Sequence, residues 1–523
     1  MKRMTQKIKP SIFLILIIIF ATFLRIQRML EWPVVSFEAL HMNFAMEILQ
    51  GTRHIYEPVM YHQGPMILYF LLPSTFLFKD NVFLLRLSLV SINILSILLL
   101  YLFTKKFYNK KIALLTAFVL AVTPNDILNS SLVFETTLVT FFILLSINLL
   151  YKFISNKKIY YLYLFAVVLG FGLSTRLSFL FFVIALFIAL KLYPPNKLAQ
   201  IKKQIKINQL IPLLLFFLLG AFPILYWNLL NNFATLTFVL SSIPTTNYGV
   251  SLLDFKGNVL TSYHDFIKFL DHEERIIPTT FESIPHTYGA LFLISLLIFI
   301  FLPILRLRRS KFAEVLSKNL LIFLIFILFL TLKSTLTVSV FASEDFLPLL
   351  PIYSIIIAWS VYTTFIFLKN TKVFLLLLLI FLFSLNFVVF FSNLDQNLSQ
   401  VKDNPCYSII PKLLTYSENS SSNILVFSTN RYREIFKFYQ PNAKTFYLEG
   451  RFGTMDRTNI PWNEIIKQKN ATYVFVIESC DPYWARNIEL DFIEFLAKNN
   501  KKLLLEKNIT LDNVPLLTLF KVA

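Results

Sequence analysis

The sequence predicts a multi-pass α-helical membrane protein with about eleven transmembrane helices, followed by a small C-terminal α/β domain outside the membrane. The chain has 523 residues, is 56% hydrophobic and contains 57 Phe but only 10 Gly, which is too apolar for a soluble protein. Several apolar runs reach the ~18 or more residues typical of a transmembrane helix. From residue 393 onward the hydrophobicity falls and short strand-like runs appear. We therefore predict a membrane domain over 1–392 and a second domain over 393–523.

The apolar runs give the positions of the expected helices. We expect transmembrane helices over 11–30, 82–103, 112–128, 131–151, 159–175, 177–193, 210–230, 288–305, 319–338, 346–368 and 372–392. The run "MILYFLLPSTFLF" (66–78) is too short to cross a bilayer and contains Pro73, so we expect an interfacial or re-entrant element there.

The basic residues predict the orientation. With the N-terminus inside, the inner segments are 1–10, 104–111, 152–158, 191–209, 305–318 and 369–372. They hold nearly half of the 49 Lys and Arg and one acid, Glu314. Their surplus of positive charge exceeds the net charge of +19 of the whole chain, which is the positive-inside pattern. The charge therefore indicates topology and not a nucleic-acid partner. We expect an integral protein of the bacterial cytoplasmic membrane, with an extracytoplasmic C-terminal domain.

Two long outer loops and the C-terminal domain complete the expected organisation. In the first loop (31–81), apolar residues recur with helical spacing over 37–49, which predicts a helix lying in the membrane interface. The second loop covers 231–287 and contains "DHEER" (271–275), expected to be solvated. In the C-terminal domain we expect strands over 423–429, 472–479 and 515–522 and helices over 431–439 and 490–499. Cys406 and Cys480 could form a disulfide or remain two thiols.

Ionisable residues inside the expected spans mark a candidate site, because charge within a bilayer is costly. Six candidates lie in the outer half of an expected span or at its outer end: Arg25, Arg28, Arg86, Glu135, Arg176 and Lys333. One interpretation is snorkelling of the side chains toward outer headgroups. The other is a polar cavity open to the outer face, in which arginine forks bind a lipid phosphate and an acid removes a proton from an attacking hydroxyl.

At these residues the sequence resembles the integral-membrane glycosyltransferases of the C superfamily. It looks most like the branch with protein O-mannosyltransferases and lipid A aminoarabinose transferases. The resemblance rests on "SFEALHMNFAMEILQG", "YHQGPMILYFLL", "FGLSTRLSFLFFVIALF" and the Arg-led span that starts at "RLSLVSINIL". "SEDFLPLLPIYSII" is a weaker, later match. It implies transfer of a sugar, with inversion, from a polyprenyl-phosphate donor to a lipid, glycan or protein acceptor on the outer face.

The resemblance also implies roles for particular residues. Glu38 takes the place of the first-loop acid that serves as general base. Glu135, the second catalytic candidate, matches an acid that the family often has early in the fourth span. Arg86 and Arg176 match positions on the donor-phosphate side. Two further candidates are Arg25, for the donor phosphate, and His62, for a metal or substrate contact. A divalent metal stays open, and no cofactor is assigned.

The sequence also departs from the family pattern. Phe37 stands where the first-loop acidic pair begins with Asp, and Asp345–Phe346 stands where the late motif has Arg-Tyr. Two alternatives therefore stay open. One is a lipid or sugar transporter or flippase, although the charged groups gather at one depth rather than at the midplane. The other is an inactive relative that acts as a binding protein. Motifs of hydrolases, Walker NTPases and dinucleotide-binding folds are absent from the sequence.

Overall fold

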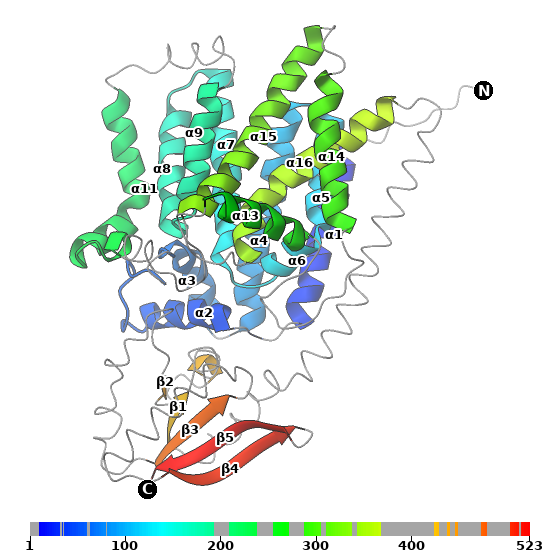
Figure 1. Cartoon of the computed structure of the whole chain (residues 1–523). Coiled ribbons are helices and arrows are strands. Elements are labelled where there is room, and N and C mark those ends of the chain that lie inside the picture. The colour runs from blue at the N-terminus through cyan, green and yellow to red at the C-terminus, as the bar shows by residue number, and fades with distance from the viewer. Residues whose placement is uncertain are drawn as a thin grey trace. The chain divides into compact units, whose positions relative to one another are not determined.

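The computed structural model describes most of the helical part of the chain and the strands of its C-terminal part (Figure 1). The described residues are 10–31, 34, 36–59, 63–79, 81–192, 209–237, 255–270, 287–304, 310–336, 343–367, 423–427, 437–439, 445–447, 472–478, 503–511 and 514–522. Several predictions fall outside them: His62, both cysteines, "DHEER", the last span (372–392) and the helix over 490–499.

The chain forms two compact units, which are described separately. The first contains Met1–Leu30, Arg53–Ser74 and Phe83–Leu394, and the second contains Glu31–Thr52, Thr75–Val82 and Asp395–Ala523. The predicted domain boundary at 392/393 lies outside the described residues and stays a prediction.

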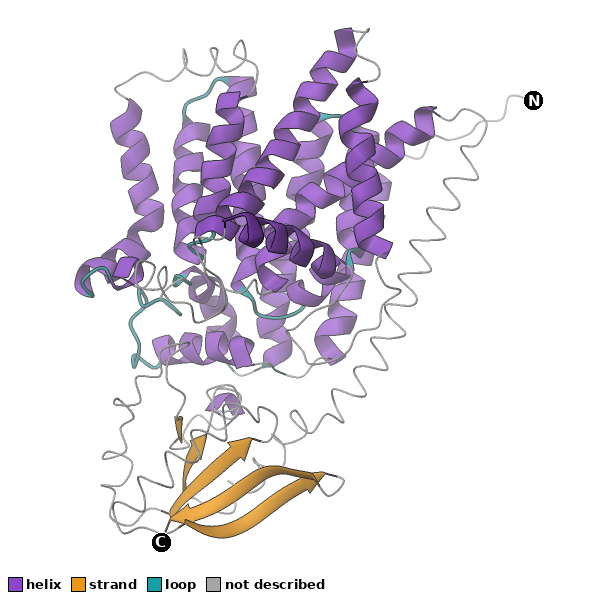
Figure 2. Ribbon diagram, viewed as in Figure 1, coloured by secondary structure: helices purple, strands orange, loops and turns teal. Residues whose placement is uncertain are grey.

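The first unit is a bundle of helices (Figure 2). Its elements are α1 (Pro10–Glu31), α3 (Met66–Phe78), α4 (Val82–Phe107), α5 (Lys110–Val122), α6 (Pro124–Ser130), α7 (Glu135–Asn156), α8 (Tyr160–Thr175), α9 (Phe179–Leu192), α11 (Leu210–Leu230), α13 (Phe255–Leu270), α14 (Thr287–Ile304), α15 (Ser310–Leu336), the 3-10 helix η2 (Ser343–Leu349) and α16 (Leu350–Phe367).

The described helices confirm an integral membrane protein. Among them, six are long and apolar enough to cross a bilayer, or seven if the bent pair α5–α6 is one span. Three shorter apolar helices, α8, α9 and α14, lie where spans were expected, and α3 occupies the run that was expected to be interfacial or re-entrant. The total of eleven spans and the placement of α3 stay predictions.

The expected span over 112–128 is wrong in one respect, because it is broken. α5 ends at Val122, α6 begins at Pro124, and the two helices are bent by 60°. Thr123 between them is extended (φ −68°, ψ 118°). Proline disfavours the helical conformation in the residue before it and has no N–H for a helical hydrogen bond. The break therefore follows from Pro124 and turns α6 away from the line of α5.

Two glycines let α8 and α11 approach closely. A Cβ added at Gly170 would lie 2.4 Å from the carbonyl oxygen of Phe217, and one added at Gly220 would lie 2.2 Å from that of Val167. Ser174 adds a hydrogen bond of 3.1 Å to the carbonyl of Gly220. Small residues at the crossing point are the common way to pack helices in a bilayer, where burial from water gives no driving force between helices.

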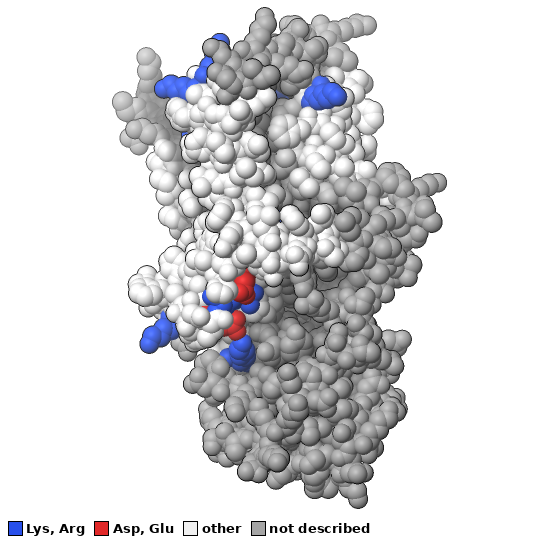
Figure 3. Space-filling model, turned by 90° about the vertical axis from the view of Figure 1, so that its left-hand side faces the viewer, with Lys and Arg blue, Asp and Glu red and all other residues white. Residues whose placement is uncertain are grey.

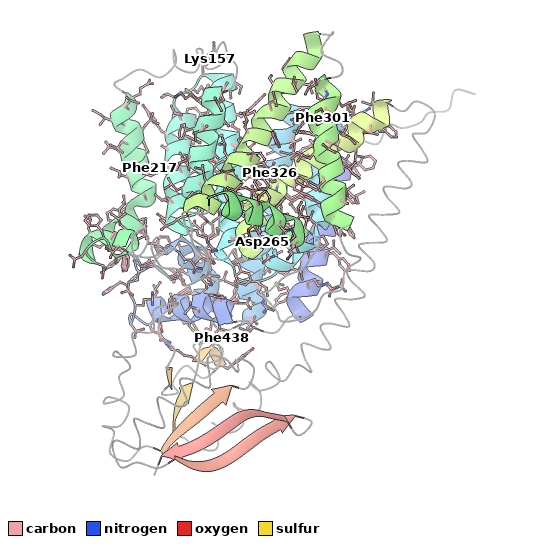
Figure 4. All side chains as sticks on the ribbon, viewed as in Figure 1. Lys157, Phe217, Asp265, Phe301, Phe326 and Phe438 are labelled. Carbon is pink, nitrogen blue, oxygen red and sulfur yellow. The ribbon has the colours of Figure 1, made fainter. Side chains whose placement is uncertain are left out.

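The loop helix α13 packs into an aromatic cluster with α14, α15 and η2. Phe266 of α13 lies 5.6 Å from Phe292 and 5.2 Å from Phe326, measured between ring centroids; Phe326 is labelled in Figure 4. Phe346 of η2 contacts Phe266 at 5.6 Å. These ring contacts hold α13, which lies within the expected 231–287 loop, against the helices of the bundle.

The helical unit presents an apolar surface. Figure 3 shows a broad band of its described surface without Lys, Arg, Asp or Glu. α11 contributes strongly to this surface, since Leu215, Leu219 and Phe222 are exposed. An exposed apolar band is the expected lipid-facing surface of a membrane protein.

The second unit contains a mixed sheet and the helix α2 (Ser36–Leu49). The strands are β1 (Asn423–Phe427), β2 (Thr445–Tyr447), β3 (Thr472–Glu478), β4 (Leu503–Leu511) and β5 (Val514–Val522), in the order β2-β1-β3-β5-β4. β1 pairs in parallel with β2 and β3, whereas β5 pairs antiparallel with β3 and β4.

The three expected strands are confirmed as β1, β3 and β5. The sequence reading missed β2, which has only three residues, and β4, whose apolar run is interrupted by Glu506 and Lys507. Of the helix expected over 431–439, only 437–439 is described as helical. The sheet of the C-terminal domain is thus observed, whereas its helices, and with them the α/β class, stay predictions.

The helix expected over 37–49 is confirmed as α2, but its burial differs from a simple amphipathic pattern. The polar side chains of Glu38, His41 and Asn43 are buried, whereas Leu49 at its end is exposed. Gly51 then adopts a left-handed conformation (φ +73°) just past the helix end, a conformation that glycine accepts readily. The interfacial position of α2 stays a prediction.

Candidate functional site

Arg176 and Glu135 form a buried ion pair in the helical unit. Nη1 of Arg176 donates to Oε1 of Glu135 at 2.6 Å, and both side chains are over nine-tenths buried. Glu135 opens α7 and Arg176 directly follows α8. The partial charges at helix ends favour an anion at an N-terminus and a cation at a C-terminus. The start of α7 therefore favours the negative charge of Glu135, and the end of α8 favours the positive charge of Arg176.

A short strand-like contact fixes the backbone of Arg176. Arg176 is extended (φ −157°, ψ 138°) and forms an isolated antiparallel bridge with Gln63. The amide of Gly64 donates to the carbonyl of Thr175 at 3.0 Å. A Cβ on Gly64 would lie only 1.9 Å from the carbonyl oxygen of Ser174, so only glycine permits this approach. The segment before α3 is thus held against the end of α8.

Arg25 is the centre of a second buried network. Its Nη2 donates to Oδ2 of Asp126, and its Nε donates to Asn93 at 2.7 Å and to Ser130 at 3.0 Å. Its Nη1 donates to two backbone carbonyls, of Ala21 and of Ala121 in α5. Acceptors from α1, α4, α5 and α6 thus surround this guanidinium. Its N–H groups point at protein atoms and not at a lipid headgroup.

Arg86 joins α4 to the end of α1. Its Nη1 donates to the carbonyl of Met29 at 2.8 Å, and its side chain is buried. Met29 lies in the last turn of α1, where carbonyls lack partners within the helix. Arg86 therefore satisfies a helix C-terminus in addition to any contact with a ligand.

The buried charges form two clusters in the helical unit, one around Arg25 and one around Arg176. Arg25 connects the last turns of α1 to α4 and α6, and the short loop 131–134 leads from α6 to Glu135. Glu135 in turn contacts Arg176. That all of these residues share one depth in the membrane stays a prediction. Two neutral residues of these clusters were not predicted from the sequence, Gln63 and Asn93, which donates to Asp126. Uncharged residues do not stand out within an apolar run.

The remaining candidates have different outcomes. Glu38 lies in the first turn of α2 in the second unit and is fully buried. His62 lies outside the described residues. The part of the chain with described side chains contains no group of three or more His, Cys, Asp or Glu that could hold a metal ion.

Comparisons with known proteins agree with this architecture. Residues 62–227 match the family model of dolichyl-phosphate-mannose-protein mannosyltransferases, and this range includes Arg86, Glu135 and Arg176. A search of curated proteins finds no match.

Solved structures with a similar fold cover nearly the whole chain. ArnT from Cupriavidus metallidurans bound to undecaprenyl phosphate matches with a TM-score of 0.61 at 10% identity, over 97% of each chain. The archaeal oligosaccharyltransferase AglB from Archaeoglobus fulgidus, in complex with an inhibitory peptide and a dolichol-phosphate, matches with a TM-score of 0.51 at 15% identity, over 92% of this chain and 72% of that chain. The chain therefore has the fold of ArnT and AglB, and the family match over 62–227 agrees with the resemblance found in the sequence.

Proposed function

We propose that this protein is a membrane glycosyltransferase that transfers a sugar from a polyprenyl-phosphate donor to an acceptor on the extracytoplasmic face. The observation that carries the proposal is the buried Arg176–Glu135 pair at one end of the bundle. A buried guanidinium held in a fixed orientation suits a phosphate. The similar structures of ArnT and AglB contain undecaprenyl phosphate and dolichol-phosphate, which supports a donor of this class.

In the proposed reaction, a general base removes the proton from the acceptor nucleophile as it attacks the anomeric carbon of the sugar. The bond between that carbon and the phosphate oxygen breaks, and polyprenyl phosphate leaves with the bonding electrons. Negative charge therefore grows on the phosphate during the reaction. Arg176 stabilises this charge, because donors fixed before the reaction need no reorganisation in the transition state. Attack from the face opposite the phosphate inverts the anomeric configuration.

The proposal divides the charged residues by their contacts. Glu135 holds the Arg176 guanidinium in place and is a positioning residue. Arg86 is a second donor-phosphate candidate, since it lies near the end of α1. Arg25 has a structural role, because five protein acceptors already engage its guanidinium.

Glu38 is the proposed general base. This role rests on the family resemblance of the loop that contains it and on its burial in the first turn of α2. The family's acidic pair begins with Asp at the position of Phe37. Glu38, the next residue, is therefore the acid that remains at this pair.

The test compares cells that lack the protein with cells that carry wild type or Glu38→Gln. Mass spectrometry of extracytoplasmic glycolipids, glycans and glycoproteins should show one sugar modification that requires wild type. Glu38→Gln should reduce its rate of formation at least ~100-fold, the lower range for general-base catalysis.

A matched control lies on the same helix. Glu47 is further along α2 and is partly exposed, so Glu47→Gln should leave the modification in place. Unchanged product with Glu38→Gln would remove Glu38 from the mechanism. If wild type produced no sugar modification yet bound a polyprenyl phosphate, the chain would be a binding protein and the enzyme proposal would be wrong.

A further inference from the structure

A glutamine beside the Arg176–Glu135 pair has no assigned role in the reaction above. Gln63 is 3% exposed, and its side-chain oxygen Oε1 is buried without a hydrogen-bond partner among the described residues. A buried acceptor that lacks a donor is costly, and native structures contain few of them. This oxygen therefore calls for a specific explanation.

The backbone register places Gln63 next to Arg176. The two residues face each other in the antiparallel bridge. Residues directly opposite in such a pair point to the same face, with Cβ atoms about 4.5–5.5 Å apart. The amide of Gln63 and the guanidinium of Arg176 thus extend from the same side of the contact.

The segment cannot easily shift to satisfy the oxygen by itself. Gly64 donates to Thr175 at 3.0 Å and packs directly on the carbonyl of Ser174. Both neighbouring contacts fix the backbone at the residue that follows Gln63. A second buried polar atom without a partner among the described residues, Oγ1 of Thr136, lies directly after Glu135 in the chain.

The chemistry of the missing partner can be stated. An amide oxygen accepts hydrogen bonds and cannot donate them. The oxygens of an ionised phosphate also only accept, so a phosphate bound at Arg176 cannot satisfy Oε1 of Gln63. The partner must carry an O–H or N–H group. In a polyprenyl-phosphate sugar, the sugar carries such groups, and the sugar is bonded directly to the phosphate.

We infer that Gln63 is a specificity-determining residue whose Oε1 accepts a hydrogen bond from a hydroxyl or amino group of the donor sugar, next to the phosphate at Arg176. This inference rests on the proposed function. It separates two parts of donor recognition: Arg176 contacts the phosphate, and Gln63 contacts the sugar.

The test measures the affinity of purified protein in nanodiscs for two lipids. They are undecaprenyl phosphate alone and undecaprenyl phosphate that carries mannose or glucose. Wild type should bind a sugar-bearing lipid more tightly than the bare lipid. Gln63→Met, which keeps the length of the side chain and removes its polar atoms, should lose about 10-fold of that preference, a loss typical of one buried hydrogen bond to a ligand. Its affinity for the bare lipid should stay that of wild type.

Thermal stability distinguishes this role from a structural one. Replacing an unsatisfied buried polar group with an apolar group of similar shape is neutral or stabilising, so the Tm of Gln63→Met should equal or exceed that of wild type. Thr104→Val is the matched control. Oγ1 of Thr104 is also buried without a partner among the described residues. Thr104 lies near the C-terminal end of α4 and not beside Arg176. It should keep the lipid preference unchanged.

Each other outcome overturns a defined statement. Wild type that binds neither lipid would contradict the proposed function. Wild type that binds both lipids equally, or Gln63→Met that keeps the wild-type preference, would contradict the role of Gln63 and leave the phosphate site intact. A clear fall in the Tm of Gln63→Met would show that Gln63 has a structural partner, and the inference would be wrong.

Discussion

Arg176 and Glu135 are 41 residues apart in the sequence, yet their side chains meet at 2.6 Å in a buried ion pair. The pair joins the start of α7 to the end of α8. Because breaking a buried pair leaves one charge without compensation, each partner depends on the other. This relationship makes the pair testable as a unit.

We predict that Glu135→Ala destabilises the protein more than the double variant Glu135→Gln/Arg176→Gln. The single change leaves a buried guanidinium without its carboxylate, at a cost of about 3–5 kcal/mol. The double change keeps hydrogen-bonding groups and removes both charges together. The measurement is thermal unfolding of the purified variants. A double variant as unstable as the single one would show that the pair does not act as a unit.

We predict that Gly64→Ala prevents the approach of the segment before α3 to the end of α8. The added Cβ would lie 1.9 Å from the backbone oxygen of Ser174, which cannot rotate away. Gly51→Ala is the comparison, because its Cβ would meet no atom within 4 Å. Its cost is only that of the left-handed backbone, about 1–2 kcal/mol. Gly64→Ala should lower the Tm more than Gly51→Ala, and the reverse order would contradict the close contact.

We predict that Lys437 and Glu47 interact in the second unit. Nζ of Lys437 contacts Oε1 of Glu47 on α2, and both side chains are partly exposed. Such pairs contribute about 0.2–1 kcal/mol. Lys437→Glu or Glu47→Lys should lower the Tm slightly, and the exchange of both residues should restore it. Failure of the exchange to restore the Tm would show that the two charges are not coupled.

We predict that Arg25 and Asp126 are needed for the fold and not for the donor. Asp126→Ala leaves the buried Arg25 without its carboxylate, and about 3–5 kcal/mol should be lost. The double variant Arg25→Met/Asp126→Leu should recover much of this, since well-packed apolar groups can replace a buried pair. Thermal unfolding compares the two variants. Equal stability of Asp126→Ala and wild type would contradict the network.

Much of the helical fold follows from the sequence, because long apolar runs predict where the helices lie. The expected span over 210–230 coincides with α11. The break between α5 and α6 was missed, although Pro124 gives a local signal for it. The hydrophobicity of the run as a whole concealed that signal, because the helices on both sides of the break contain apolar residues.

The candidate site was only partly predictable. Arg176 and Glu135 each stood out as a charge inside an apolar run, but their pairing depends on how α7 and α8 lie side by side. Gln63 carries no charge and gave no signal. Its position became clear only from the bridge to Arg176, which joins residues far apart in the chain. Asp126 falls inside the expected span over 112–128 and was not singled out, so its contact with Arg25 was missed.

The most direct test of the account measures undecaprenyl phosphate binding to wild type and to two double variants in nanodiscs. Glu135→Gln/Arg176→Gln and Arg25→Met/Asp126→Leu each remove one buried ion pair without changing the net charge. If the phosphate binds at Arg176, the first variant should lose at least about 10-fold in affinity, because a charge-assisted contact is lost, and the second should bind as wild type does. Equal binding by the first variant and wild type would contradict the central claim.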